Sequence, residues 1–487
     1  MSSNLEKIQH IVLLMLENRS FDHMLGWLYT DQQNRSPLGQ AYEGLTGKES
    51  NPGSNGQAVP VFRITPTTEN AQFMPCVNPG ESFIRRNVQL FGTKRAPSKA
   101  PLPAQSNQGH VQDFANRIQE MPNAPRKQFY IEGTAESAIM GCFAPETLPV
   151  LSALARGFAV CDQWFASVPS ETFPNRAFAL AGTSLGQIDD TFAKPPSYNT
   201  PSIFGRLVDA GKQWRIYGCG RVLTMNDFPD TMDPAQAWRK GSFTDFKSAA
   251  ANGTLPEFSF IEPAWGGGGA VGQNDQHPVS DVFAGEQLIA DTYAALRNGP
   301  DWSSTLLIIT YDESGGCYDH VPPPWGGGVV APDKSTDSSV NKFAFNRLGP
   351  RVPAVLVSPW IRPGTVFRAP DGAPPIEHTV VLKTIQNKWN LAPLPSKRVA
   401  AACDLSSVLS LNAARTDDPL RNVQVPHFDG PNPSAADITH LHDMHASTLE
   451  KHPSLKGDKT VPKERPENSV DFVNYMKGLE QRIRQKS

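Results

Sequence analysis

The chain opens on an apolar run, Ile8-Gln-His-Ile-Val-Leu-Leu-Met-Leu16, which ends at the acidic residue Glu17. Short, continuous runs of aliphatic residues are typical of strands buried on both faces of a parallel sheet. The apolar stretch 11–16 is too short to span a bilayer and lacks the small-residue cleavage site of a signal peptide. The run therefore predicts a buried strand whose carboxyl end carries Glu17.

Similar strand-like runs and helical stretches alternate along most of the chain. Strand and helix in alternation predict a sheet with helices on both faces. We therefore predict an α/β fold, a three-layer α/β/α sandwich with a mostly parallel central sheet and long active-site loops. The predicted strands are 8–16, 158–161, 214–217, 258–261, 306–311 and 354–357, the helices include 149–156, 203–210 and 285–297, and the loops are 92–109 and 321–341.

The overall composition excludes some classes of protein. The chain has 487 residues, with 45 Lys and Arg against 48 Asp and Glu and a formal net charge of -3. No global positive field is available to hold nucleic acid, so we expect no nucleic-acid partner. Six scattered cysteines form no CxxC pair and are interpreted mainly as buried thiols. The chain as given is expected to be cytoplasmic, although a processed or otherwise exported form would look the same.

We divide the chain into a catalytic domain, residues 1–395, and a C-terminal loop and helix extension, residues 396–487, packed on it. In the extension Phe472, Met476, Leu479 and Ile483 follow helical spacing. Residues 451–487 hold nine Lys or Arg against five Asp or Glu, which would allow peripheral contact with an anionic membrane. A solvated polar face is the simpler interpretation of this excess.

Acidic residues follow three of the predicted strands. Glu17 follows the first, Glu262 follows 258–261, and Asp312 with Glu313 follows 306–311. Ligands of open α/β sheets bind beyond the carboxyl ends of the strands, so these acids are expected to converge. Glu17, Asn18, Asp312 and Glu313 supply the hard oxygen ligands that suit a divalent cation. The alternative is that they are ordinary polar turn residues.

The segment Ser167-Val-Pro-Ser-Glu-Thr-Phe-Pro-Asn-Arg176 precedes a predicted helix start at 177–181. Helix N-termini favour bound phosphate, so Thr172 or Ser170 could attack phosphorus there if metal coordination activated the oxygen. Both hydroxyls could instead be helix N-caps. Arg176 could bind phosphate with two hydrogen bonds or pair with an acid.

Histidines are the natural proton donors near neutral pH. Of the eleven present, four lie in polar or Pro-rich contexts that suit a site: His110, His277, His320 and His378. Taken singly, each is more often a structural or surface residue than a catalytic one.

The same residues fall in motifs that resemble a known family. The run Glu17-Asn-Arg-Ser-Phe-Asp-His-Met-Leu-Gly-Trp27 is similar to the opening motif of the phosphoesterase family of bacterial phospholipases C, Francisella-type acid phosphatases and plant non-specific phospholipases C. The likeness covers roughly residues 8–395. It continues in order through Thr172-Phe-Pro-Asn-Arg176, Asn274-Asp-Gln-His-Pro278, Tyr311-Asp-Glu-Ser-Gly-Gly-Cys-Tyr-Asp-His-Val-Pro322, Arg351-Val-Pro to Ser358-Pro-Trp360, and Glu377-His-Thr379.

The resemblance implies an alkaline-phosphatase-like fold with one divalent metal ion, which could be Ca²⁺, Mg²⁺, Mn²⁺ or Zn²⁺. It implies Thr172 as the nucleophile, with Ser170 as the fallback. The implied metal ligands are Glu17, Asn18, Thr172, Asp312 and Glu313, the implied acids or phosphate ligands are His110, His277 and His320, and the implied substrate-binding residues are Asn18, Arg176 and His378.

The function implied is a metal-dependent phosphoesterase that hydrolyses the glycerol-side phosphodiester of phospholipids through a phosphothreonine intermediate. The first alternative is a broad-specificity acid phosphatase that acts on phosphomonoesters. The second is a catalytically silent module that binds lipid or phosphate. The residues after the last matching motif are predicted to form loop and helix, unlike the additional C-terminal β-rich domains of the haemolytic members, so haemolysis is not implied.

Overall fold

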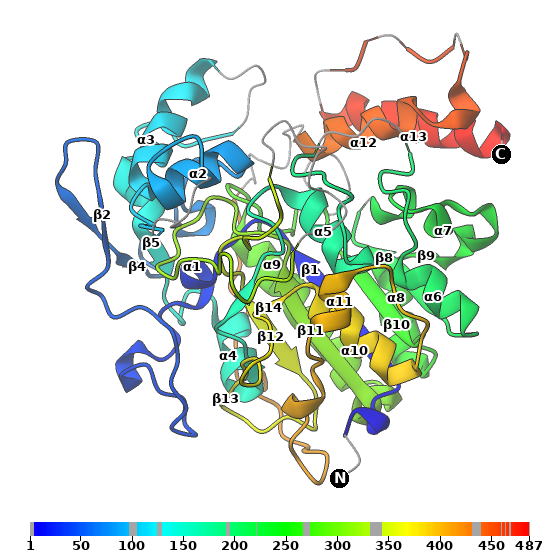
Figure 1. The fold of residues 1–487 in the computed structure, drawn as a ribbon, viewed down its shortest axis with the longest axis horizontal. Helices are drawn as coiled ribbons and strands as arrows, with labels where there is room; N and C mark the ends of the chain where they lie inside the picture. Colours follow the sequence, from blue (N-terminus) through cyan, green and yellow to red (C-terminus); the bar gives the residue numbers. More distant parts are fainter. Residues whose placement is uncertain are drawn as a thin grey trace.

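The computed structural model describes residues 4–96, 105–123, 129–190, 195–220, 222–265, 273–331, 343–430, 440–458, 460–462, 464–466 and 469–486. Within these residues, an eight-stranded sheet forms the centre of the molecule (Figure 1). Its order is β13 (Thr365–Val366), β6 (Ala159–Val160), β12 (Ala354–Val357), β11 (Thr305–Tyr311), β1 (His10–Leu16), β10 (Phe258–Glu262), β8 (Trp214–Gly218) and β9 (Lys240–Ser242).

All six predicted strands belong to this one sheet. Strand β1 lies between β11 and β10 and is parallel to both. Strand β12 is the exception, because it is antiparallel to both β11 and β6, and the prediction that 354–357 is a parallel strand is wrong. Between β11 and β12 the described residues, 312–331 and 343–353, contain no crossover helix, and β12 enters the sheet from the edge at which β11 ends, so it runs in the opposite direction.

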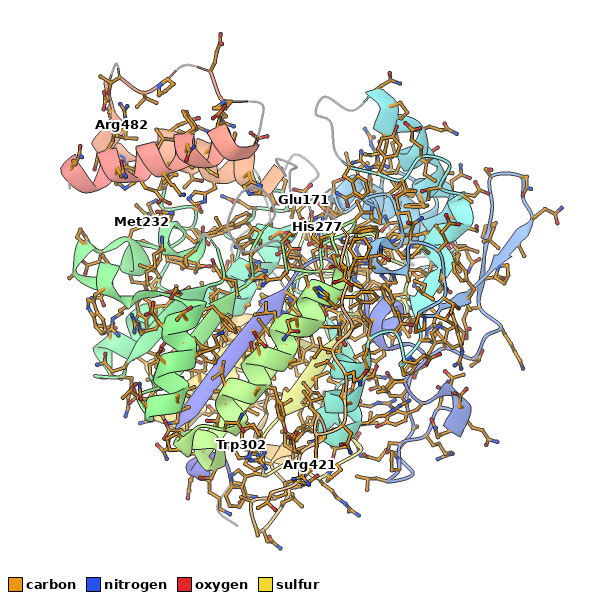
Figure 2. All side chains as sticks on the ribbon, turned by 180° about the vertical axis from the view of Figure 1, so that it is seen from behind. Glu171, Met232, His277, Trp302, Arg421 and Arg482 are labelled. Carbon is orange, nitrogen blue, oxygen red and sulfur yellow. The ribbon has the colours of Figure 1, made fainter. Side chains whose placement is uncertain are left out.

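Helices cover both faces of the sheet, and the predicted three-layer arrangement is confirmed (Figures 1 and 2). Helices that pack against one another hold each outer layer together. One layer contains α4 (Pro149–Gly157), α8 (Phe243–Asn252) and α9 (Val282–Arg297), and the other contains α5 (Thr172–Ala181), α6 (Ile203–Asp209), α10 (Thr379–Trp389) and α11 (Lys397–Ala401).

A smaller lobe lies beside the sheet, at the left of Figure 1. It has its own apolar cluster, which includes Trp27, Val111, Phe114 and Met140. Its elements are α1 (Phe21–Leu25), α2 (Phe83–Phe91), α3 (His110–Glu120), the pair β2 (Ser50–Pro52) and β3 (Ala58–Pro60), and the pair β4 (Phe62–Ile64) and β5 (Gly141–Phe143). Of the two predicted loops, residues 97–104 and 332–341 lie outside the described residues.

The C-terminal residues belong partly to the main body and partly to a helical hairpin. Leu405, Val408 and Leu409 are buried in the main core. Beyond them, α12 (His440–Glu450) packs on α13 (Ser469–Lys486), above the carboxyl edge of the sheet in Figure 1. The predicted helix at 472–483 is confirmed in α13, and the division at 395 and 396 stays a prediction. The hairpin has a separate core of Ala446, Leu449, Leu455, Phe472, Met476 and Leu479.

Taken over the residues that the structure describes, every helix falls short of the length and apolar character that crossing a membrane requires.

Helix α4 receives its N-terminal cap from another helix. The amides of Val150 and Leu151 donate to the Glu286 carboxylate of α9, at 2.6 and 3.0 Å, while Leu148 at the N-cap position supplies no side-chain bond. Such amides at a helix start have no partner within the helix itself. Glu286 therefore joins two helices of one layer. Burial raises the pKa of Glu286 to about 8, against which the two amide bonds act.

We expect Glu286→Gln to flatten the dependence of stability on pH. Because the folded-state pKa of about 8 lies above the ordinary value of 4.5, the folded protein holds this proton more tightly. Its contribution to stability is complete below the ordinary pKa and is lost as the pH rises through about 8. Urea unfolding between pH 5 and pH 8 should show wild-type stability falling by roughly 1 kcal/mol per pH unit relative to Glu286→Gln. The exposed Glu146→Gln is the control, and parallel curves for Glu286→Gln and wild type would contradict the expectation.

Candidate active site

Thr172 lies at the first turn of α5, where it is fully buried. The helix begins five residues before the predicted start at 177, so Thr172 stands among the N-terminal amides that favour an anion. Its Oγ1 lies 3.3 Å from both Glu17 Oε2 and Asn18 Oδ1. A hydroxyl has only one proton to donate. Three oxygens therefore converge at this point, and the Thr172 hydroxyl can donate to only one of the other two.

The neighbouring hydroxyl of Ser170 faces elsewhere. Its Oγ donates to the carbonyl of Ile188, and the side chain of Asn175 binds the backbone of the same loop, including the Ser170 carbonyl at 3.2 Å. The N-cap position of α5 is occupied by Glu171. The N-cap interpretation of Ser170 and Thr172 is therefore wrong, and the geometry favours Thr172 over Ser170 as the hydroxyl of the site.

Glu17 and Asp312 meet because their strands are neighbours in register. Leu16 of β1 pairs with Tyr311 of β11, so the next residue on each strand emerges at the same level. Asp312 Oδ1 accepts the amide of Asn18 at 3.1 Å. Asn18 itself has a φ of 55°, in the left-handed region that ordinary residues avoid. The turn after β1 is thus held in an unusual conformation beside the Asp312 carboxylate.

Gly315 allows the loop after β11 to approach this turn. A Cβ atom at Gly315, where φ is +60°, would lie 2.0 Å from the carbonyl oxygen of Asn18. Since no larger residue could fit, the glycine is what permits the two loops to touch.

Arg176, one turn along α5, binds the carboxylates. Its Nη2 lies 2.6 Å from Glu17 Oε1, its Nε lies 3.3 Å from Asp312 Oδ2, and its guanidinium is 4.3 Å from the ring centre of Trp265. The sequence left two roles open for Arg176, binding phosphate or pairing with an acid, and in the structure Arg176 pairs with the carboxylates. Its Nη1 has no hydrogen-bond partner among the described residues.

The charges at this point do not balance. Burial and the nearby Asp312 raise the pKa of Glu17 well above its ordinary value, even though Arg176 opposes the shift. Burial likewise raises the pKa of Glu313, whose Oε2 accepts from the buried Arg86. Three buried carboxyl groups therefore face two guanidinium groups. Such a site favours additional positive charge.

The residues fit a divalent cation. Thr172 Oγ1 lies within hydrogen-bonding distance of Glu17 Oε2 and Asn18 Oδ1, and Asp312 Oδ1 accepts the backbone amide of Asn18 beside them. Glu313 Oε1 is buried, and no partner for it exists in the described part of the chain. Oxygen donors with an excess of negative charge suit Mg²⁺, Mn²⁺ or Ca²⁺.

His277 reaches the same site through Glu81. Asn18 Nδ2 donates to Glu81 Oε2 at 2.6 Å, and His277 Nε2 lies 3.8 Å from that oxygen. The amide of His277 donates to Asp275, whose carbonyl accepts the amide of Glu17. Glu81 and Arg86 were missed by the sequence analysis, since no pattern in the chain distinguishes them from solvated charges on α2 and the turn before it.

His320 lies in a second acidic cluster. Its Nδ1 is 2.6 Å from Asp22 Oδ2, and these two residues with Asp319 form a group whose ligand atoms lie within 4.8 Å of one another. Arg351 donates to Asp22 at 2.8 Å and to Asp319 at 3.0 Å. Arg351 thus offsets one of the two carboxylate charges of this cluster, and a protonated His320 ring offsets the other. Within the described ranges, no hydrogen bond or ion pair joins His320 to Thr172 or Glu17.

The other two predicted histidines lie behind the site. Burial and Arg86 lower the pKa of His110 to about 3, so its ring is neutral at pH 7, and its Nδ1 faces the carbonyl of Gly316 at 3.4 Å. His378 Nε2 lies 2.6 Å from the carbonyl of Asp312, and its Nδ1 accepts from Trp164 at 3.2 Å. His378 therefore supports the backbone of Asp312. Glu262 also has a structural role, because its carboxylate accepts hydrogen bonds from the amides of Leu223 and Thr224.

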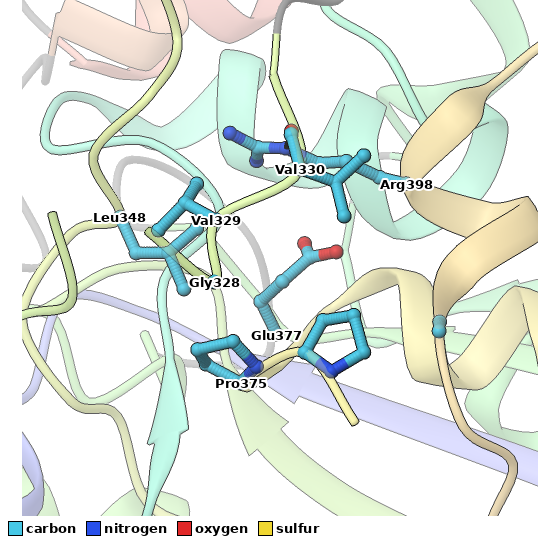
Figure 3. A pocket seen from close by; sticks show the side chains of 9 residues that line it. Gly328, Val329, Val330, Leu348, Pro375, Glu377 and Arg398 are labelled. Carbon is cyan, nitrogen blue, oxygen red and sulfur yellow. Dashed lines mark hydrogen bonds between the residues drawn. The ribbon is translucent and has the colours of Figure 1, made fainter. Parts of the chain in front are cut away.

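A small cavity near His378 is too confined for a substrate. It has a volume of about 20 Å³ and is lined by Glu377, Arg398 and Pro375 among others (Figure 3). That volume holds about one water molecule. Glu377 accepts hydrogen bonds from Ser167 and Thr379, so its role is structural.

The sequence matches proteins of known classes over most of its length. The family described as "Phosphoesterase family" matches residues 8–392. Non-specific phospholipase C3 of Arabidopsis thaliana is 34% identical over 479 residues, covering 94% of this chain and 84% of that protein. Non-specific phospholipase C4 of the same plant is 36% identical over 429 residues, covering 85% and 73%. Phospholipase C B of Mycobacterium tuberculosis is 28% identical over 476 residues, covering 90% and 81%.

Solved structures are more distant. A protein in the alkaline phosphatase superfamily from Vibrio parahaemolyticus overlaps 53% of this chain and 63% of its own, with 12% identity and a TM-score of 0.33, which is too low to support an inference. The family match covers most of the chain, and the fold brings the ordered motifs of the sequence together. The chain belongs to the phosphoesterase family and is a hydrolase of phosphoric ester bonds.

Proposed function

We propose that the protein is a phospholipase C that cleaves the glycerol-side phosphodiester of phospholipids, with Thr172 as the nucleophile. The observation that supports this most directly is the position of Thr172 Oγ1, which lies 3.3 Å from both Glu17 and Asn18 at the start of α5. The relatives of this chain include plant proteins named non-specific phospholipase C and bacterial proteins named phospholipase C.

Thr172 attacks the phosphorus in the first step. The bond from phosphorus to the diacylglycerol oxygen breaks, and the phosphorylated head group remains on Thr172. Water hydrolyses this phosphothreonine ester in the second step and releases the head-group phosphate. The amides of the first turn of α5 stabilise the charge on the phosphoryl oxygens. Arg176 holds Glu17 and Asp312 in place for both steps.

One divalent ion completes the proposed site. Glu17, Asn18, Thr172, Asp312 and Glu313 would hold it, and when bound it neutralises phosphoryl charge and favours the deprotonated form of the Thr172 hydroxyl. The excess of buried carboxyl groups over guanidinium groups supports this assignment.

A histidine protonates the leaving alcohol. Burial lowers the pKa of His320, but Asp22 outweighs burial and the net shift is upward, so this ring keeps its proton to higher pH than an ordinary histidine. His277 is the other candidate because it lies near Glu81 and Asn18. The neutral His110 is the weakest of the three as a proton donor.

The substrate test compares two reactions. We expect the purified enzyme to release diacylglycerol from phosphatidylcholine, and we expect Thr172→Ala to lower kcat by at least about 10³-fold, since no other hydroxyl replaces the nucleophile. Acid quenching during turnover should trap head-group phosphate on wild type but not on this variant. Ser170→Ala is the matched control and should stay within about threefold of wild type.

Two outcomes would replace the proposal. Release of phosphate from a soluble monoester without release of diacylglycerol would identify an acid phosphatase. Stoichiometric lipid or phosphate binding without product, in metal-replete enzyme, would identify a silent binding module. Full activity in Thr172→Ala would remove that residue from the mechanism.

Removal of metal should abolish turnover. After chelation and dialysis we expect no release of diacylglycerol, and addition of Mg²⁺, Mn²⁺, Ca²⁺ or Zn²⁺ one at a time should identify the ions that restore it. Elemental analysis should find one equivalent in the native enzyme. Glu17→Gln should weaken ion binding at least tenfold by calorimetry, because it removes a charged ligand. Glu43→Gln, an acid outside the site, is the control, and an undiminished rate after complete chelation would contradict metal dependence.

Asp22→Asn should move the basic limb of the kcat/KM profile to lower pH. The protonated form of His320 is present below its pKa and is lost as the pH rises through it, and Asp22 is what keeps that pKa high. A titration of the histidine rings by NMR would report the same change directly. Glu43→Gln should have less effect, because Glu43 Oε1 is 3.9 Å from the ring and the side chain is 45% exposed. If the NMR pKa falls but the rate profile stays in place, His320 is not the acid.

A further inference from the structure

A large groove lies between the C-terminal hairpin and the main body. Its volume is about 1190 Å³, above the ~300 to 1,000 Å³ of most small-molecule sites. One wall contains the carboxyl ends of β8 and β9 and the chain around Met225 and Met232, and the other contains Leu449, Ser454 and Ile483 of the hairpin. Figure 2 shows Met232 on the side of the main body that faces the hairpin.

The lining of the groove suits an apolar ligand. Val222, Met225, Met232, Leu449 and Ile483 line it, and its surface is more apolar than polar. The charged side chains along it are of both signs, Lys240 against Asp233, Asp245 and Glu480. No cluster of positive charge is present here, among the residues described, that would select a phosphate group. A hydrocarbon chain is the occupant that matches this surface.

The groove and the candidate active site lie along the same edge of the sheet. Gly218, which lines it, pairs with Glu262 of β10, and the amide of Cys219 donates to the Glu262 carbonyl at 3.0 Å. Strand β10 is in turn the neighbour of β1, and Glu17 directly follows β1. Since adjacent strands lie about 4.8 Å apart, the groove begins on the order of 10 Å across the sheet from Glu17. A phosphodiester at Thr172 and an acyl chain in the groove can therefore belong to one lipid molecule.

An exposed aromatic residue stands next to the groove. Trp238 is 57% exposed and follows Ala237, which lines the groove. The guanidinium of Arg239 lies 4.5 Å from the ring centre of Trp238. Exposed tryptophan next to a cationic side chain is suited to the head-group region of a lipid surface, where one part of the ring is apolar and the other is wet.

We infer that this groove binds one fatty acyl chain of the phospholipid substrate while the phosphodiester lies at Thr172, so that the C-terminal hairpin forms part of the substrate site. The inference rests on the proposed phospholipase C function. It assigns the hairpin a role in choosing long-chain lipids over soluble esters.

The test compares substrates that differ only in chain length. Met232→Glu places a charge in the groove, and Met232→Leu is the matched control that keeps it apolar. With palmitoyl-oleoyl phosphatidylcholine in mixed micelles, we expect kcat/KM of Met232→Glu to fall at least tenfold, because a carboxylate beside hydrocarbon is strongly unfavourable. With dibutyryl phosphatidylcholine, whose chains are too short to fill the groove, both variants should stay within about twofold of wild type.

A second variant approaches the groove from the other wall. Ser454→Trp fills space from the hairpin and should cause the same loss on the long-chain substrate, and it replaces Met232→Glu if that variant fails to fold by circular dichroism. Binding of a pyrene-labelled diacylglycerol to wild type, Met232→Glu and Ser454→Trp gives a readout that needs no catalysis.

The outcomes separate the groove from the proposed function. If wild type hydrolyses neither phosphatidylcholine, the phospholipase C proposal fails, and weaker binding of the labelled diacylglycerol to the two variants would still establish the groove as a lipid site. If wild type is active and the folded variants keep both its preference for long chains and its affinity for diacylglycerol, the groove does not bind the acyl chain.

Discussion

The burial of three carboxyl groups at one edge of the sheet is the constraint on which the site depends. Glu17, Asp312 and Glu313 are removed from water, and Arg176 and Arg86 offset only part of their charge. Ionised groups in such surroundings are costly unless they are paired or bind a cation. The fold supplies the partner guanidinium groups of Arg176 and Arg86, and the charge that they leave is met by the raised pKa values of Glu17 and Glu313.

Several distant segments are held together by this charge cluster. Strands β1 and β11 bring Glu17 and Asp312 to the same level, α5 adds Thr172 and Arg176, and α2 adds Arg86. Close approach of the two strand-end loops requires Gly315 and the left-handed conformation of Asn18. A loss of any of these contacts would leave buried charge unpaired, so the architecture and the chemistry of the site are coupled.

The histidines divide into groups with different surroundings. His320 belongs to a network with Asp22, Asp319 and Arg351, in which carboxylates and guanidinium largely neutralise one another. His378 lies behind Asp312, and both of its ring nitrogens face fixed partners. His277 lies near Glu81, and Glu81 accepts a hydrogen bond from the side chain of Asn18. The same residue type thus lies in a charged network, behind a carboxylate, or beside a neighbouring acid, according to burial and neighbours.

The sequence by itself determined the α/β class, the six strands, the C-terminal helix and the family, because apolar periodicity and motif order are local properties of the chain. It also indicated Glu17, Asn18, Thr172, Asp312 and Glu313 as candidate site residues. Only the tertiary structure decided the reversed direction of β12, the early start of α5, the pairing of Arg176 with acids and the presence of Glu81 and Arg86. These features depend on which distant groups are buried together, and burial of a charge leaves no local signal in a sequence.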